Sequence, residues 1–170
     1  MILSVNDISS ALFESLPILH RKRGNPGRKD TDFYYKDLVC AFDIETTRWK
    51  YGEKYISPDV KRDLEFSIMY IWQFQIGLDI TIIGRQWDEF LKLISYIKSG
   101  LKDNQRIVVY VHNLSYEFQF LRDENILGKE INEKSVFILS ARKILKFSFV
   151  TSRGFVNREI GNLWFNCTSG

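Results

Sequence analysis

Two carboxylates, Asp43 and Glu45, lie at the end of the apolar run Leu38–Ile44. Such a run is typical of a strand buried on both faces, and side chains two residues apart on a strand point to one face. The two carboxylates should therefore converge on one point, where their like charges repel unless a cation lies between them. Divalent ions such as Mg²⁺ prefer carboxylate oxygens, so the pattern indicates a metal site. The alternative is that both acids mark the place where the strand leaves the core.

A second group of polar residues follows the next buried-strand pattern, Ile107–Val111. A helical stretch begins shortly after this strand, at Leu114, which makes the segment a strand-to-helix junction. Asn113, Tyr116 and Glu117 lie at the start of the helix. A third carboxylate can therefore join the first two.

These two segments, taken together and in this order, resemble motifs of a known enzyme family. Residues 42–47 read Phe-Asp-Ile-Glu-Thr-Thr and residues 112–117 read His-Asn-Leu-Ser-Tyr-Glu. They resemble the first and second exonuclease motifs of family B DNA polymerases, particularly the protein-primed type of phages and plasmids. The resemblance covers roughly residues 38–150. It implies an α/β, ribonuclease-H-like fold with a mixed sheet flanked by helices.

The same resemblance implies a 3′-to-5′ proofreading exonuclease that acts on the 3′ end of single-stranded DNA. Two divalent metals, Mg²⁺ or Mn²⁺, would be held by Asp43, Glu45 and Glu117. Asn113 and Tyr116 would contact the terminal nucleotides, and Thr46 and Thr47 would flank the primer end. Further partners would be the rest of a polymerase or a priming protein, in the cytoplasm of a bacterial cell that carries the phage or plasmid.

The sequence departs from the family pattern in two ways. Glu117 stands where the second motif usually has Asp, which moves the carboxylate by roughly 1.5 Å. The third motif, Tyr-x-x-x-Asp, is absent, because no tyrosine follows Tyr116 and no aspartate follows Asp123. We therefore expect a fold that is incomplete at its C-terminus and an isolated chain that hydrolyses little.

Two other hypotheses remain open. In the first, the chain is a non-catalytic module that keeps the ribonuclease-H-like scaffold and binds DNA or a protein. In the second, a companion fragment supplies the remaining carboxylate. Common phosphate-loop, nucleophile-elbow and zinc-protease motifs are missing, so no other enzyme class competes.

Hydrophobic patterning predicts the elements that position these residues. Two β-rich runs at residues 66–76 and 78–83 indicate a hairpin with its turn at residues 77–79, and apolar residues at helical spacing predict a helix from Trp87 to about Gly100. The helix that begins at Leu114 should end near Glu124. Further strands are expected at residues 136–139 and 144–150. Four large aromatic residues are expected to pack in the core rather than stack on bases: Trp72, Phe74, Trp87 and Phe90.

Composition sets the broader limits. The chain has 170 residues, 45% hydrophobic and 15% aromatic, with a net charge of +3, which fits one globular domain. We divide it into a basic arm (1–36), an exonuclease domain (37–150) and an atypical tail (151–170). Five cations lie among glycine and proline in residues 20–29, a loop that could contact phosphates or simply be solvated. No apolar run approaches the ~20 residues that span a bilayer, and the two cysteines match no metal or disulfide pattern, so a cytosolic protein without a membrane partner is expected.

Overall fold

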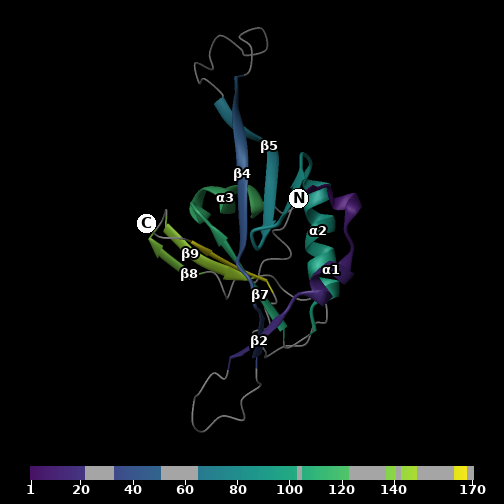
Figure 1. Cartoon of the computed structure of the whole chain (residues 1–170). Helices are drawn as coiled ribbons and strands as arrows, with labels where there is room; N and C mark the ends of the chain where they lie inside the picture. The colour runs from purple at the N-terminus through teal and green to yellow at the C-terminus, as the bar shows by residue number, and fades with distance from the viewer. Residues whose placement is uncertain are drawn as a thin grey trace, which may run out of the picture.

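The structure is a computed structural model, and it describes most of the chain. The described residues are 1–21, 33–50, 65–102, 105–122, 137–140, 143–148 and 163–167. They form an α/β protein with a curled mixed sheet flanked by helices (Figure 1). None of the described helices has the length and apolar character needed to cross a membrane.

The central strand of the sheet is β4 (Cys40–Lys50), which carries the first pair of acids. It pairs antiparallel with β5 (Glu65–Ile76) on one side and parallel with β7 (Gln105–Val111) on the other. β6 (Ile80–Gly84) pairs antiparallel with β5, through the predicted turn in which Gly77 has a φ of +58°. A positive φ favours glycine, so the hairpin turn lies where its sequence allows it.

Two helices connect and cover these strands. α2 (Trp87–Gly100) runs from β6 to β7, and α3 (Leu114–Leu121) directly follows β7. Both helices were predicted, and α3 ends three residues earlier than expected. Glu89 in the first turn of α2 accepts hydrogen bonds from the backbone N–H groups of Arg85 and Gln86, at 2.7 and 3.0 Å, which fixes the helix start.

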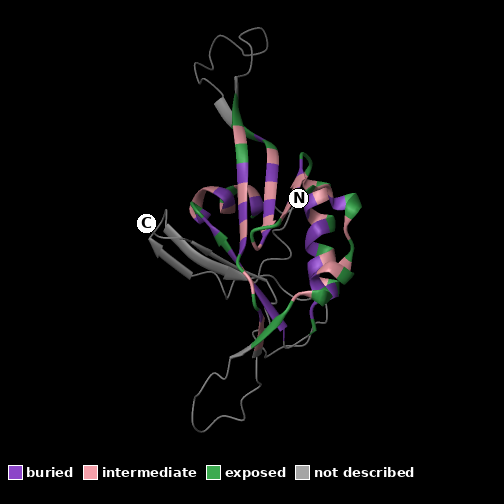
Figure 2. Ribbon diagram, in the orientation of Figure 1, coloured by how far each residue is buried: buried purple, intermediate pink, exposed green. Residues whose placement is uncertain are grey.

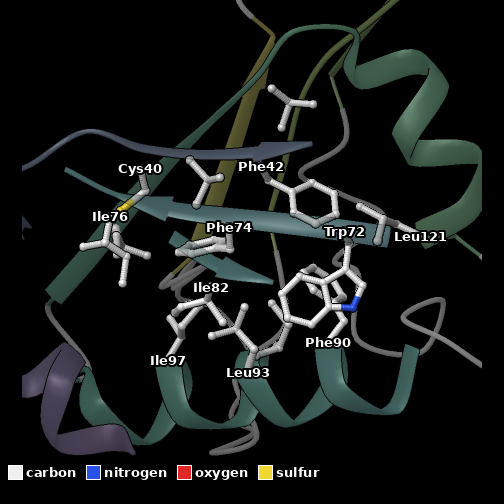
Figure 3. Close-up of a cluster of buried hydrophobic side chains, with 14 of the residues drawn as sticks. Cys40, Phe42, Trp72, Phe74, Ile76, Ile82, Phe90, Leu93, Ile97 and Leu121 are labelled. Carbon is white, nitrogen blue, oxygen red and sulfur yellow. The ribbon is translucent and has the colours of Figure 1, made fainter. Parts of the chain in front are cut away.

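The hydrophobic core lies between the sheet and α2 (Figure 3). Phe90 is fully buried, and its ring centroid lies 4.8 Å from that of Phe42 and 5.3 Å from that of Trp72. Phe74 is also fully buried, and Trp87 packs against the core from its edge. The prediction that these aromatic side chains pack in the core is confirmed.

The N-terminal residues differ from the predicted basic arm. They contain β1 (Ile2–Leu3), a short 3-10 helix (Val5–Asp7), α1 (Ser10–Ser15), β2 (Ile18–Arg21) and β3 (Phe33–Lys36). β1 pairs with β6 and β3 pairs with β7, so this segment extends the sheet. Phe13 of α1 is fully buried, and a Cβ at Gly100 would lie only 2.8 Å from the Phe13 Cβ. The cation-rich stretch at residues 22–29 lies outside the described residues.

The C-terminal part also differs from the predicted tail. β8 (Phe137–Ser140) and β9 (Lys143–Ser148) form the expected antiparallel pair. β10 (Leu163–Cys167) was not predicted, and it lies between β9 and β7, parallel to β7. The strand order is β1-β6-β5-β4-β7-β10-β9-β8.

Candidate active site

Asp43 and Glu45 lie on one face of β4, as predicted. Phe42 and Ile44 are buried, Asp43 is half-buried and Glu45 is exposed, so the side chains alternate between the two faces of the strand (Figure 2). Gln73 is directly opposite Asp43 on β5, and its Nε2 donates a hydrogen bond of 3.3 Å to Asp43 Oδ2. Sequence reasoning missed Gln73, although the hairpin register would have identified it.

Glu117 is the most deeply buried carboxylate of the predicted set. Because β7 ends level with Phe42 of β4, α3 begins beside the part of β4 that carries the acids. Only 3% of Glu117 is exposed, and its Oε2 atom has no hydrogen-bond partner among the described residues. Burial, together with the negative charge of Asp43, raises the pKa of Glu117 to about 7. Asp43 and Glu117 therefore interact electrostatically, and a cation would relieve both costs.

The start of α3 is held by backbone contacts rather than by the side chain of Asn113. The carbonyl oxygen of Asn113 accepts hydrogen bonds from the N–H groups of Tyr116 (2.8 Å) and Glu117 (3.3 Å). The exposed Asn113 side chain makes no capping bond. It is therefore accessible to an external group, as the predicted role in nucleotide binding requires.

Thr46 and Tyr116, both predicted to contact DNA, are bonded to each other. The Thr46 Oγ1 and Tyr116 Oη atoms lie 2.6 Å apart across a sequence separation of 70 residues. The Tyr116 ring also packs edge-on against Phe120, with centroids 5.3 Å apart. The contact joins α3 to β4 one residue away from both Glu45 and Glu117. In this structure Thr46 and Tyr116 thus fix the relative position of the two motifs.

A double-mutant cycle on Thr46→Val and Tyr116→Phe tests this contact. Each change removes one hydroxyl and keeps the shape of the side chain, so we expect a coupling free energy of about 1 kcal/mol from urea unfolding. Strictly additive effects of the two substitutions would show that the bond contributes nothing to joining the helix and the strand.

The predicted set is brought together only in part. Within the ranges that the structure describes, no three His, Cys, Asp or Glu side chains are grouped closely enough to hold a metal ion. Glu45 and Thr47 are exposed on the strand. The geometry is thus an interacting pair, Asp43 and Glu117, with Glu45 farther along the same strand face.

Comparisons with protein-family models, with curated proteins and with solved structures find no match for this chain.

Proposed function

We propose that this chain is the exonuclease segment of a protein-primed DNA polymerase and acts on the 3′ end of single-stranded DNA. The observation that carries the proposal is the buried Glu117 carboxylate, which has an unpartnered oxygen and faces the charge of Asp43. Buried polar atoms without partners are rare in native proteins and often mark a site for an ion. The two resembled motifs supply these two residues.

The topology supports a ribonuclease-H-like sheet as part of the proposal. The first motif lies on the central strand β4, and the second begins the helix that follows the neighbouring parallel strand β7. A hairpin and a helix separate them in the chain, as the predicted order of elements requires. The two motifs are brought to one end of the strands, where their carboxylates can cooperate.

The residues present fit a divalent ion at Asp43 and Glu117. Both offer carboxylate oxygens, which Mg²⁺ and Mn²⁺ prefer, and Glu45 adds a third on the same strand face. When bound, such an ion would activate water and stabilise the leaving 3′ oxygen. Gln73 orients the Asp43 carboxylate by its hydrogen bond, and the Thr46–Tyr116 contact holds α3 against β4. Asn113 and Thr47 remain exposed for contacts with the nucleotide.

The proposal is tested by nucleotide release from a 3′-labelled single-stranded oligonucleotide. We expect release in Mn²⁺, none in EDTA, and none from the Asp43→Asn variant. Asp79→Asn is the matched control, because Asp79 is an exposed aspartate in the β5–β6 turn and its removal should leave release intact. Wild-type protein that releases no nucleotide in Mn²⁺ would overturn the enzymatic proposal for this chain.

A second candidate function is a binding module that does not cleave DNA. It is favoured by the finding that the described residues group no three potential metal ligands. This module would bind single-stranded DNA equally well in Mn²⁺ and EDTA, and Asp43→Asn would leave the affinity unchanged. The two functions are distinguished by measuring binding and release on the same oligonucleotide.

A further inference from the structure

β4 and β5 extend beyond their neighbours as a two-stranded ribbon next to the candidate site. The pairing of β4 with β7 ends at Phe42, and the pairing of β5 with β6 begins only at Trp72. The residues of β4 from Asp43 onward therefore pair only with β5, and Figure 1 shows this ribbon rising past the helices. The carboxylates lie at the base of the ribbon.

The ribbon contains an irregularity that changes which residues of β5 face inward. Glu45 pairs with Ile71 and Thr46 pairs with Met69, so Tyr70 is an extra residue in β5. Trp72 is fully buried and Met69 is only 8% exposed, whereas Tyr70 between them is 51% exposed. Met69 thus takes the inward position that regular alternation would give to Tyr70, and Tyr70 and Ile71 both turn to the opposite face (Figure 2).

The exposed face of the ribbon combines acidic, polar and apolar side chains. Glu45, directly opposite Ile71, belongs to the same face as Asp43 and Tyr70. Farther along, Thr47 pairs with Ile68, which is 39% exposed. An aromatic ring and an aliphatic side chain are therefore held in water immediately beside the carboxylates. Because Met69 already fills the core position, packing does not account for an aromatic residue at position 70.

We propose that Tyr70 is a stacking residue that holds a base of the single-stranded DNA beside the carboxylates. This inference rests on the proposed function and adds a substrate-positioning residue to it. An exposed aromatic ring binds any base through its face, so it suits an enzyme or module without sequence preference. β-Bulges are over-represented next to active sites, where they re-aim a side chain, and this one turns Tyr70 toward the face of Glu45.

The test measures DNA binding in EDTA, so that it does not depend on cleavage. The probe is a short single-stranded oligonucleotide that carries 2-aminopurine, a fluorescent base that is quenched when it stacks, at the 3′ end or at one of the next positions. We expect quenching at one position in the wild type and its loss in Tyr70→Ala, with the dissociation constant raised about tenfold. Tyr70→Phe keeps the ring and should keep both the quenching and the affinity. Leu78→Ala, at a site that is 94% exposed in the β5–β6 turn, should change neither.

The outcomes separate this inference from the proposed function. If Mn²⁺-dependent release occurs but Tyr70→Ala binds and quenches like the wild type, the role of Tyr70 is wrong and the exonuclease stands. If release never occurs but quenching depends on the ring at position 70, the stacking role stands on a binding module. If Tyr70→Phe loses affinity as Tyr70→Ala does, the ring is not the binding group and stacking is overturned. A thermal melt of each variant establishes that the fold is kept.

Discussion

Phe13→Ala is expected to lower the free energy of unfolding by about 3–5 kcal/mol, the usual cost of removing a fully buried aromatic side chain. Phe13 lies on α1, which packs against α2, and the Phe13 Cβ stands close to Gly100. The surrounding side chains come from two helices held by the sheet, so the cavity left by the ring cannot easily collapse. Urea unfolding followed by tryptophan fluorescence measures the loss.

Leu78→Ala is the control for this experiment, because the Leu78 side chain is almost fully exposed and its truncation should cost less than about 0.5 kcal/mol. If Phe13→Ala cost no more than Leu78→Ala, residues 1–21 would not belong to the cooperatively folding unit. The experiment therefore decides whether the N-terminal segment is part of the domain or an arm attached to it.

The sequence identified the elements whose pattern is local. α2 shows apolar residues at helical spacing over four turns, and the β5–β6 hairpin has a glycine at the turn, so each is legible within its own window. Both motifs lie on the predicted strand and helix for the same reason. The alternation that places Asp43 and Glu45 on one face also follows from β4 alone.

The elements that were missed depend on partners far away in the chain. β1 has two residues and α1 has six, too short for a periodic pattern, and both are stabilised by contacts with β6 and α2. β10 is likewise a five-residue strand that is recognised only through its pairing with β7 and β9. The extra residue at Tyr70 and the Thr46–Tyr116 bond arise from the register of two strands and the placement of a helix. Neither is encoded in a local pattern.

Glu117→Gln is expected to remove a pH-dependent destabilisation of about 3 kcal/mol. The pKa of Glu117 is raised from 4.5 to about 7 in the folded protein, so between these values the folded state retains a proton that the unfolded state releases. The stability from this group is present below pH 4.5 and is lost as pH rises to about 7. Stability measured in urea should therefore fall with pH in the wild type, and this part of the fall should be absent in Glu117→Gln.

Glu45→Gln provides the matched control, since it makes the same change in an exposed carboxylate on the neighbouring strand. It should keep the fall in stability between pH 4.5 and pH 7, whereas parallel pH profiles for wild type and Glu117→Gln would show that Glu117 is not buried as described. Mn²⁺ added at pH 8 extends the argument to the proposed metal. An ion that binds the folded state at Asp43 and Glu117 should restore stability to the wild type and to a lesser extent to Glu117→Gln. Equal stabilisation of both proteins would place any bound metal elsewhere and leave the buried carboxylate without a ligand to explain it.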